Sequence, residues 1–574
     1  MKYSNIPSAQ SIVFHCQAQG IKDIIISPGS RNAPLTIGFT ENPFFRCYSI
    51  VDERCAAFFA LGISQQSARP AALVCTSGSA LLNYYPAIAE AFYSDIPLIV
   101  ISADRPPYKI DIGDGQTIRQ ENVFAKHIAY SANLVLDPTA FKSPISSKPS
   151  EPQEVQEHND RELNTAFNKA IVGRGPVHIN VPFEEPLYET ISSMTVSPNI
   201  RKETVSGTSI VEDYTDFLTT WNNSTRKMVL VGTNPPNSIA DAFLEVLGTD
   251  NSVLVLTETT SNLYHPNFFP SIDSIVAPLE KLEDRDKHFR DLRPQIVLTI
   301  GGMIVSKKIK AFLREYSPDH HWHVGPKKAY DTFFCLSQHF KIEANEFFKT
   351  FLKGTAKVES NYYDHWNETR KRYRVKRENY LKEIPFSDMF AFSSILRSIP
   401  KGYQVQLANS STVRYAQLFD MDPSLEVFSN RGTSGIDGST STAIGASMYC
   451  KSPTLLLTGD LSFLYDSNAL WNDHIRADFR IIVINNGGGG IFRILPGKEA
   501  TENFEKFFET VQNIELKKLC SLFDLDYALA QNEKDLSDLL SEFYKKSERP
   551  KLLEIRTPRF RNDKILLTYF DFLS

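Results

Sequence analysis

Short runs of apolar, largely β-branched residues recur along the chain, with segments of helical character between them. In the first third of the chain these runs lie at 23–27, 72–75 and 97–103. The alternation stops at 143–160, where the residues are polar and include prolines, and resumes at 177–181 after an expected helix over 161–171. Uninterrupted apolar runs of this length are typical of parallel strands buried on both faces, so the pattern predicts βαβ units.

The same alternation occurs twice more. A second set of runs lies at 228–232, 252–256 and 296–301, and a third at 404–407, 454–458, 480–485 and 551–556. The charged, basic segment between these sets is expected to be a solvated linker helix rather than a binding patch. We therefore expect an α/β protein with three doubly wound domains and mainly parallel sheets. The expected domains are 1–188, 205–355 and 385–574, with 356–384 as the linker.

Composition limits the classes of function. Of the 574 residues, 42% are hydrophobic and 22% are charged, values typical of globular domains. The 62 basic and 67 acidic residues give a net charge of −5, so no overall positive field attracts nucleic acid. Seven scattered cysteines without a CxxC pair argue against a disulfide framework and a zinc site. No signal peptide, membrane span or amphipathic anchor is recognisable, so we expect a cytoplasmic protein without a stable membrane anchor.

The glycines are concentrated in one region, which carries the clearest chemical signal. Nine of the 27 glycines lie between Gly432 and Gly490. Asp460 follows one apolar run, and Asn486 follows the next and precedes four glycines. Parallel strands bring their carboxyl ends to one edge of a sheet, where a carboxylate, an amide and bare backbone suit Mg²⁺ carrying a diphosphate. The pattern predicts that these glycines form a diphosphate and magnesium cradle.

Other sites explain the sequence less well. A dinucleotide site requires G-x-G-x-x-G spacing, which GGGGIF lacks, and no P-loop occurs. Ordinary turns between strands would account for one glycine but hardly for four in succession. The twelve histidines include no HExxH pair, and TSGSA is not a nucleophile elbow. The cluster of His320, His321 and His323 is therefore expected to be structural or surface-exposed.

A series of motifs extends over the whole chain. In order, they are SPGSRNAPL (27–35), VDERCAAFFALG (51–62), TSGSALLNYYPAIAEA (76–91), ISADRPP (101–107), GQTIRQ (115–120), SNRGTSGIDG (429–438), GDLSFLYD (459–466) and GGIFRILP (489–496). Together they resemble the 2-succinyl-5-enolpyruvyl-6-hydroxy-3-cyclohexene-1-carboxylate synthases, which are thiamine diphosphate enzymes of menaquinone biosynthesis. Leu461 replaces the glycine of the commoner GDG form, and GDL is the form of this family.

The resemblance implies a transferase that decarboxylates 2-oxoglutarate and adds the succinyl-semialdehyde carbanion to isochorismate in a Stetter-like conjugate addition. It implies thiamine diphosphate as cofactor, with Mg²⁺ or alternatively Mn²⁺. The first domain would bind the pyrimidine ring and the third the diphosphate. In thiamine diphosphate enzymes these two domains come from opposite subunits, so a homodimer or a homotetramer is expected.

Matching positions assign residues to the cofactor. Glu53 would assist at the pyrimidine nitrogen, and burial should raise its pKa; a surface ion pair with Arg54 is the alternative reading. Ile436 would hold the cofactor in its bent form, unless it is an ordinary core residue. Asp460, Asn486 and the carbonyl of Gly488 would bind the metal. Further cofactor contacts are expected from Thr76, Ser77, Leu461, Ser462 and Ile491.

Both implied substrates are dianions, so a chain of net negative charge must gather cations locally to bind them. The implied substrate residues are Ser30, Arg31, Arg105, Gln116, Lys307, Lys308, Ser410, Arg414, Arg431, Phe492 and Leu495. The two lysines are explained equally well as solvent-facing. Ile491, Phe492 and Leu495 would wall the cavity, although such a run also suits the first turn of a core helix.

Two other functions stay open. A thiamine diphosphate enzyme acting on pyruvate would share the cofactor motifs, but the arginines of SPGSR and DRPP favour dianionic substrates. A catalytically silent scaffold is expected to lack Glu53, Asp460 or Asn486, and all three are present.

Overall fold

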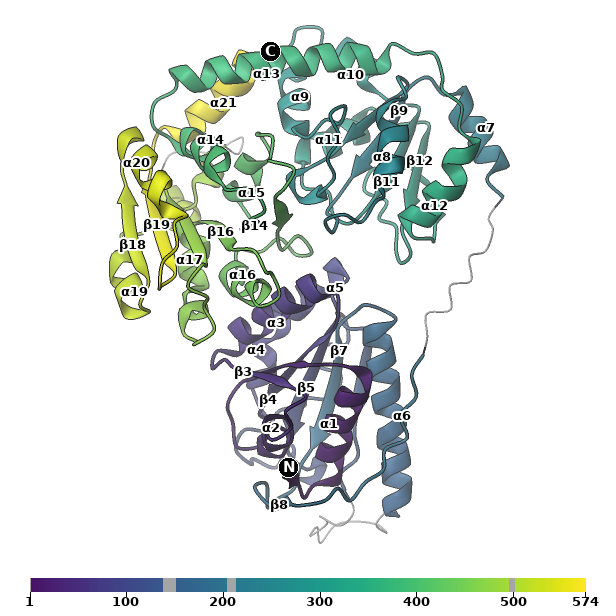
Figure 1. The fold of residues 1–574 in the computed structure, drawn as a ribbon, viewed down its shortest axis with the longest axis vertical. Coiled ribbons are helices and arrows are strands. Elements are labelled where there is room, and N and C mark those ends of the chain that lie inside the picture. The colour runs from purple at the N-terminus through teal and green to yellow at the C-terminus, as the bar shows by residue number, and fades with distance from the viewer. Residues whose placement is uncertain (1, 138–150, 204–212, 495–500) are drawn as a thin grey trace. The chain divides into compact units, whose positions relative to one another are not determined.

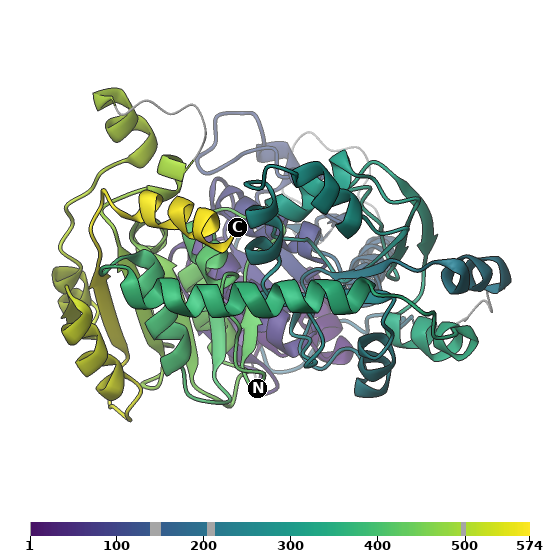
Figure 2. The same cartoon turned by 90° about the horizontal axis from the view of Figure 1, so that it is seen from above.

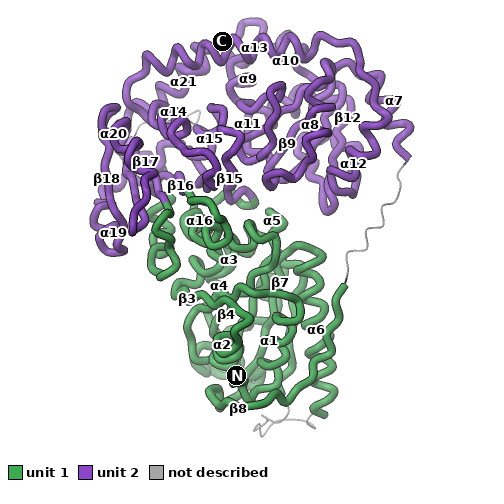
Figure 3. The backbone as a smooth tube through the Cα atoms, in the orientation of Figure 1, with its two compact units in different colours: residues 1–206, 432–454, 462–479 green, residues 207–431, 455–461, 480–574 purple. Residues whose placement is uncertain are grey.

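The computed structural model describes residues 2–137, 151–203, 213–494 and 501–574. The chain forms two compact units (Figure 3). Unit 1 comprises residues 1–206, 432–454 and 462–479, and unit 2 comprises residues 207–431, 455–461 and 480–574. Among the described residues, no helix combines the length and apolarity needed to cross a membrane.

Unit 1 contains a six-stranded sheet in the order β3-β2-β4-β5-β7-β6, and all its strand pairs are parallel (Figure 1). The strands are β2 (Asp23–Ile26), β3 (Arg46–Ser49), β4 (Ala71–Cys75), β5 (Leu98–Asp104), β6 (Tyr130–Asn133) and β7 (Val177–Pro182). Two short strands, β1 (Tyr3–Ser4) and β8 (Thr190–Ile191), pair antiparallel elsewhere. The four central strands are completely buried, as expected for apolar strands covered on both faces.

Helices cover this sheet and hold its strand ends in place. They are α1 (Pro7–Gln19), α2 (Ala33–Thr40), α3 (Glu53–Ser67), α4 (Ala80–Asn83), α5 (Tyr85–Ser94) and α6 (Pro152–Ile171). Buried residues of α1, α2 and α6 share one core with the strands, and α3 packs on β2, β4 and β5. The helix expected over 161–171 begins at Pro152, so residues 152–160 form its first turns, and residues 143–150 lie outside the described residues.

Helix α16 (Ser439–Ser447) belongs to unit 1 and crosses α3 at close range. A Cβ atom on Gly62 of α3 would lie 2.1 Å from the carbonyl oxygen of Thr442. A Cβ atom on Gly445 of α16 would lie 2.0 Å from the carbonyl oxygen of Phe59. Glycine is therefore required here for helix packing. The prediction that the glycines of 432–490 form one cradle is wrong for Gly445, and also for Gly438, whose added Cβ would meet the Phe58 ring at 2.1 Å.

The middle sheet, in unit 2, has five parallel strands in the order β10-β9-β11-β12-β13. They are β9 (Lys227–Val231), β10 (Val253–Leu256), β11 (Ile296–Ile300), β12 (His320–Val324) and β13 (Leu336–Phe340). The helices are α7 (Thr215–Asn223), α8 (Asp241–Gly248), α9 (Ile272–Leu279), α10 (Arg285–Leu292), α11 (Lys307–Glu315) and α12 (Ala344–Phe351). His321 and His323 lie in β12 and contact the Thr299 hydroxyl at 3.1 and 2.9 Å, so both are structural, as expected.

The last sheet of unit 2 has the order β15-β14-β16-β17-β19-β18. Its strands are β14 (Gln404–Leu407), β15 (Glu426–Phe428), β16 (Thr454–Gly459), β17 (Arg480–Asn485), β18 (Asp526–Ala530) and β19 (Lys551–Arg556). Its helices are α14 (Asp388–Ser398), α15 (Ser411–Ala416), α19 (Leu516–Leu522), α20 (Glu533–Phe543) and α21 (Asn562–Leu573). Helix α17 (Asp460–Tyr465) follows β16, and the chain passes from unit 2 to unit 1 within it, at residue 462. The long helix α13 (Tyr362–Glu383) precedes this sheet and runs across unit 2 (Figure 2). The α/β fold with mainly parallel sheets is confirmed.

Candidate functional site

Asp460 and Asn486 occupy corresponding positions at the ends of neighbouring strands. Strands β16 and β17 are parallel, and Gly459 pairs with Ile484. Asp460 follows the last residue of β16 and begins α17, and Asn486 follows the last residue of β17. The predicted juxtaposition at one edge of a parallel sheet is therefore present in unit 2.

The Asp460 carboxylate is almost completely buried, with 2% of the residue exposed. Burial raises its pKa to about 6, although hydrogen bonds from the Gln512 side chain and the Leu461 backbone partly oppose the shift. Gln512 Nε2 donates to Asp460 Oδ2 at 3.0 Å. No Lys, Arg or His among the described residues forms an ion pair with it. A buried carboxylate without a cationic partner suits a metal ion, which would supply the missing charge.

A second buried carboxylate orients Asn486. Asn486 Nδ2 donates to Asp388 Oδ2 at 2.9 Å, and the Thr557 hydroxyl donates to Asp388 Oδ1 at 2.6 Å. Burial raises the pKa of Asp388 to about 6. Because the amide nitrogen is committed to Asp388, the amide oxygen of Asn486 is directed away from that carboxylate. A hydrogen bond of this kind, behind a metal ligand, fixes the ligand's orientation.

The backbone after Asn486 has the conformational freedom expected of an anion cradle. Gly487 and Gly488 have φ values of +81° and +143°, which side chains strongly disfavour. A Cβ atom on Gly488 would lie 2.6 Å from the carbonyl oxygen of Glu509, and Gly489 N donates to that same oxygen. Among the described residues, no group of three His, Cys, Asp or Glu side chains gathers into a metal cluster. The donor set is instead one carboxylate, one amide and backbone, which are ligand types that Mg²⁺ accepts.

Glu53 is the first residue of α3 in unit 1, directly after the N-cap residue Asp52. Burial raises the pKa of Glu53, as expected from the sequence. Asn83 Nδ2 lies 3.4 Å from Glu53 Oε2. The alternative ion pair with Arg54 is not formed, because Arg54 donates to the carbonyl of Tyr465 and stacks on its ring. The Glu53 carboxyl is therefore half-buried and has no cationic partner among the described residues.

The TSG turn after β4 supplies a buried polar edge. Ser77 is buried, and its hydroxyl has no hydrogen-bond partner among the described residues, which is the state expected of a group awaiting a ligand. Thr76 lies against Gly29, where an added Cβ would come within 2.3 Å of its side chain. Gly78 N donates to Gln120 Oε1 at 2.8 Å, and the backbone of Gln116 packs against Gly78. The turn is thus rigidly held beside Gln116.

Arg31 and Arg105 lie close to one exposed carboxylate. Arg31 NH2 is 3.1 Å and Arg105 NH1 is 3.9 Å from Glu185 Oε1. Arg31 is buried and also donates to the carbonyl of Phe183 at 3.1 Å. Burial and the neighbouring Arg105 lower the pKa of Arg31, although Glu185 opposes this. Glu184 also interacts electrostatically with Arg31, and Asp104 interacts with both arginines. Ser30 is exposed next to them.

A second cationic group lies in unit 2. Arg414 is in α15, and burial lowers its pKa while Asp273 opposes the shift. The residue before this helix, Ser410, has φ +67° and is not glycine, a strained conformation that often marks functional sites. Arg431 donates to Asn409 Oδ1. The electrostatic environment of Lys310 includes both Arg414 and Arg431, and burial lowers its pKa.

The two lysines predicted from SKK differ in their surroundings. Lys307 is exposed at the start of α11, and Lys308 forms an ion pair with Glu280. The Ser306 hydroxyl caps this helix by accepting from Ile309 N at 3.0 Å. Lys310 of the same helix, which the sequence analysis did not single out, interacts electrostatically with Arg414 and Arg431.

The described apolar residues predicted to line the cofactor and substrate cavity are at least partly exposed to solvent. Ile436 is 37% exposed, so it is not a core residue, and its carbonyl accepts from the Ser462 hydroxyl at 2.7 Å. Ile491 and Phe492 are half-buried within a short helical turn over Gly490–Ile494. Leu461 donates its backbone N–H to Asp460. Leu495 lies outside the described residues.

Sequence reasoning missed the residues that support these groups: Glu185, Asp388 and Gln512. Each lies far along the chain from the residue it contacts, and none belongs to a recognisable motif. A buried carboxylate opposite a strand end could be found only once the sheet order was known.

Comparisons with known proteins identify two thiamine pyrophosphate binding domains in the chain. Residues 8–128 match the model of the thiamine pyrophosphate enzyme N-terminal TPP binding domain, and residues 409–555 match that of the C-terminal TPP binding domain. The chain is 56% identical over 576 residues to the 2-succinyl-5-enolpyruvyl-6-hydroxy-3-cyclohexene-1-carboxylate synthase of Christiangramia forsetii, covering 100% of both chains. Identity to the enzyme of the same name is 54% for Flavobacterium johnsoniae, with 100% of both chains covered. It is 36% for Porphyromonas gingivalis, where 100% of this chain and 98% of the relative are covered. The chain belongs to the family of 2-succinyl-5-enolpyruvyl-6-hydroxy-3-cyclohexene-1-carboxylate synthases, a family of thiamine diphosphate enzymes.

Proposed function

We propose that this protein makes 2-succinyl-5-enolpyruvyl-6-hydroxy-3-cyclohexene-1-carboxylate and CO₂ from 2-oxoglutarate and isochorismate, as a step of menaquinone biosynthesis. The observation that carries the proposal is the buried Asp460 carboxylate, which has no cationic partner among the described residues and lies at the strand end next to Asn486. It is the half-site that a metal-bound diphosphate requires. When bound, thiamine diphosphate supplies a carbon nucleophile on its thiazolium ring.

The chain's contribution at the pyrimidine side is Glu53. A carboxyl group whose pKa is raised by burial holds its proton more readily near neutral pH. Glu53 would therefore share a proton with the pyrimidine ring nitrogen of the cofactor, which is how a carboxyl group promotes tautomerisation of that ring. The unpaired Ser77 hydroxyl and the adjacent Thr76 would contact the same end of the cofactor.

The chain's contribution at the diphosphate side is a metal site. Asp460, the amide oxygen of Asn486 and the carbonyl of Gly488 would bind Mg²⁺, with Mn²⁺ as a substitute, and Asp388 would keep the Asn486 amide in register. Leu461 and Ser462 lie in the first turn of α17, directly after Asp460, and would contact the cofactor. The exposed Ile436 and the half-buried Ile491 would form apolar walls around it.

The substrates require cations at two places. Arg31 and Arg105, with Ser30 and Gln116, would bind one dianion, and displacement of Glu185 would free both guanidinium groups. Arg414 and Arg431, with Ser410, would bind carboxylates from the unit 2 side. Phe492 would exclude water from the reacting atoms. Lys307 would act only as a peripheral cation, and Lys308 would have to leave Glu280 to take part.

Glu53 and Asp460 lie in different compact units, and each unit carries only part of the site. We infer that the complete site forms between two copies of the chain, with a homodimer as the smallest active assembly and a homotetramer as a pair of such dimers. The seven cysteines are all free, which suits the reducing cytoplasm in which we place this enzyme.

The proposed reaction is tested with the purified full-length chain, thiamine diphosphate and Mg²⁺. Isochorismate absorbance should fall only when 2-oxoglutarate is also present, with one CO₂ released per isochorismate consumed. Turnover of pyruvate in place of 2-oxoglutarate would identify a different thiamine diphosphate enzyme. Binding of cofactor without turnover of either acid would identify a catalytically silent relative.

A further inference from the structure

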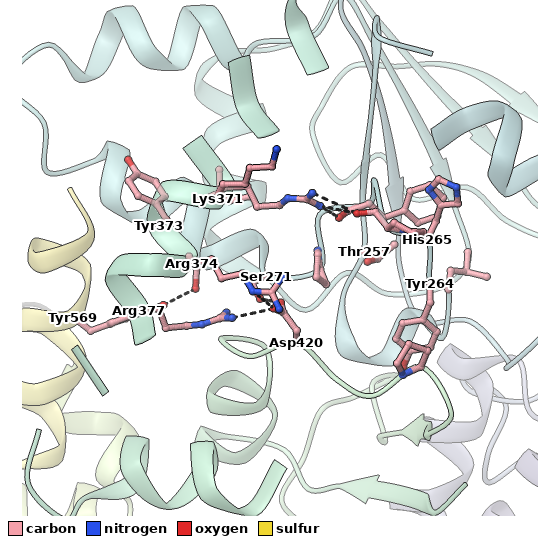
Figure 4. Close-up of a pocket in the computed structure, with 18 residues that line it drawn as sticks. Thr257, Tyr264, His265, Ser271, Lys371, Tyr373, Arg374, Arg377, Asp420 and Tyr569 are labelled. Carbon is pink, nitrogen blue, oxygen red and sulfur yellow. Dashed lines mark hydrogen bonds and ion pairs between the residues drawn. The ribbon is translucent and has the colours of Figure 1, made fainter. Parts of the chain in front are cut away.

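Unit 2 contains a cavity of about 560 Å³ that none of the proposed cofactor or substrate residues lines. Its walls are the segment from Leu263 to Ile275, the first half of α13 and the loop at Asp420, with Tyr569 of α21 at one end (Figure 4). A volume of this size is within the range of small-molecule sites. Helix α13 forms one of its walls. This is the basic segment that the sequence analysis expected to be only a solvated linker helix.

The cavity carries a strong excess of positive charge. Arg370, Lys371, Arg374 and Arg377 all line it, at spacings that place them along neighbouring rows of α13. Asp420 is the only acidic residue among the lining residues. Its Oδ2 atom lies 2.9 Å from Arg377 NH2 and 3.5 Å from Arg374 Nε, and Figure 4 shows both arginines directed toward it. Arg377 Nε also lies 3.7 Å from Glu378 Oε1, so two carboxylates face the four cations.

Arg370 and Lys371 form no ion pair with a carboxylate among the described residues, and Arg374 has only the 3.5 Å contact with Asp420. Arg370 donates to the backbone carbonyls of Pro266 and Phe268, which are neutral acceptors. Lys371 is exposed, and the side chain of Arg374 is 68% exposed, so both can reach an incoming ligand. Arg370 is half-buried, and that burial lowers its pKa, as expected for a cation held away from solvent. The positive charge at the cavity is thus available to an anion.

The opposite wall is apolar and aromatic. Tyr264, Phe268 and Ile275 contribute ring and aliphatic surface, and Tyr373 lies at the helix side. The Tyr264 hydroxyl is buried and has no hydrogen-bond partner among the residues that the structure describes. An apolar wall facing a row of cations matches a ligand with an apolar body and one anionic group.

We propose that this cavity is a binding site for a small organic anion, with an apolar or aromatic body against Tyr264 and Phe268 and its carboxylate, sulfonate or phosphate against Lys371 and Arg374. The site is separate from the thiamine diphosphate and substrate residues, so both ligands can be bound together. Two faces of the cavity come from α13 and the segment 263–275, which are far apart in sequence.

Anilinonaphthalenesulfonate, a fluorescent aromatic sulfonate, serves as the probe on the full chain loaded with thiamine diphosphate and Mg²⁺. One probe should bind per chain, and rising salt concentration should weaken binding. The double charge reversal Lys371→Glu with Arg374→Glu should weaken binding roughly tenfold or more, because two carboxylates that repel the sulfonate replace two cations that attract it. The matched control reverses Arg372 and Lys382, which are exposed on the same helix and do not line the cavity.

N-phenylnaphthylamine, which lacks the sulfonate, should bind more weakly to the wild type and should not distinguish the two double variants. Equal probe affinity for the wild type and the Lys371/Arg374 variant would overturn the proposal. So would loss of probe binding when thiamine diphosphate is added, because the probe would then occupy the cofactor site. An equal loss in the control variant would show that only the general charge of the helix matters and would also overturn it.

Discussion

Asn486 donates its side-chain amide to the buried carboxylate of Asp388, with 2.9 Å between Nδ2 and Oδ2. Asp388 lies 98 residues earlier in the chain, and its negative charge also acts on Asp460. This contact makes Asp388 a positioning residue for the amide oxygen of Asn486. It connects the start of α14 to the strand end where the cofactor would bind.

Replacing Asp388 with Ala removes the acceptor that orients Asn486. The affinity for Mg²⁺ with thiamine diphosphate should fall about 10- to 100-fold, as for other residues behind metal ligands. Isothermal titration of the cofactor measures the effect without an activity assay. The matched control is Asp364→Ala, an exposed aspartate in the first turn of α13. Unchanged cofactor affinity in Asp388→Ala would remove this residue from the site.

Glu185 lies within ion-pair distance of both Arg31 and Arg105. Replacing Glu185 with Gln removes a competing carboxylate, so KM for the dianionic substrate bound there should fall about two- to fivefold, since partly exposed ion pairs are weak. Arg31→Ala should instead raise KM. Glu154→Gln, on the exposed face of α6, is the control. An increase in KM for Glu185→Gln would show that Glu185 orients the arginines rather than competing for them.

Glu258 predicts a pH dependence of stability. It accepts hydrogen bonds from Val305 N and Ser306 N at 2.7 Å each, and burial raises its pKa from 4.5 to about 7. Between these two values the folded protein holds a proton that the unfolded chain has released, so this group makes stability fall as pH rises from 4.5 to 7. Replacing Glu258 with Gln should flatten the pH dependence of Tm in that window. An unchanged slope would show that Glu258 titrates normally.

The crossing of α3 and α16 predicts a strong packing effect. Gly445→Val would place side-chain atoms into the Phe59 backbone, where an added Cβ already lies 2.0 Å from the carbonyl oxygen. The free energy of unfolding should fall by roughly 3 kcal/mol, the upper range for overpacking. Gly115→Val is the control, since no atom lies within 4 Å of an added Cβ there. Equal Tm values for the two variants would contradict the close crossing.

Much of the fold follows from the sequence, because central strands are buried and apolar. The runs at 23–27, 454–458 and 480–485 all became central strands. The strands that the pattern did not predict include the edge strands β3, β6, β13, β15 and β18. Most of their residues are only partly buried, so they carry polar residues and show no apolar run.

In the candidate site, too, some residues could be predicted from the sequence and others could not. Asp460 and Asn486 could be predicted because each directly follows an apolar strand. Asp388 and Glu185 could not, since their roles depend on tertiary contacts across 98 and 154 residues. Gly438, Gly445 and Gly432, three of the nine clustered glycines, are packing positions that the sequence analysis assigned to the anion cradle. Gly432, for example, lies against the Glu90 backbone. Close packing and anion binding both require a residue without a side chain, so the sequence does not distinguish them. The boundaries expected for three domains remain predictions.

The most direct test of the central claim is a subunit-mixing experiment with two inactive variants, Glu53→Gln and Asp460→Asn. Each variant alone should lose at least about 100-fold in turnover, since each lacks one essential carboxyl group. If Glu53 and Asp460 of one site come from different copies, a heterodimer contains one intact site and one doubly substituted site. Unfolding, mixing in equal amounts and refolding should then restore about a quarter of wild-type activity. Differential tagging of the two variants would show that heterodimers have formed. If these mixtures were no more active than the separate variants, the claim that one site combines Glu53 and Asp460 of different copies would be contradicted.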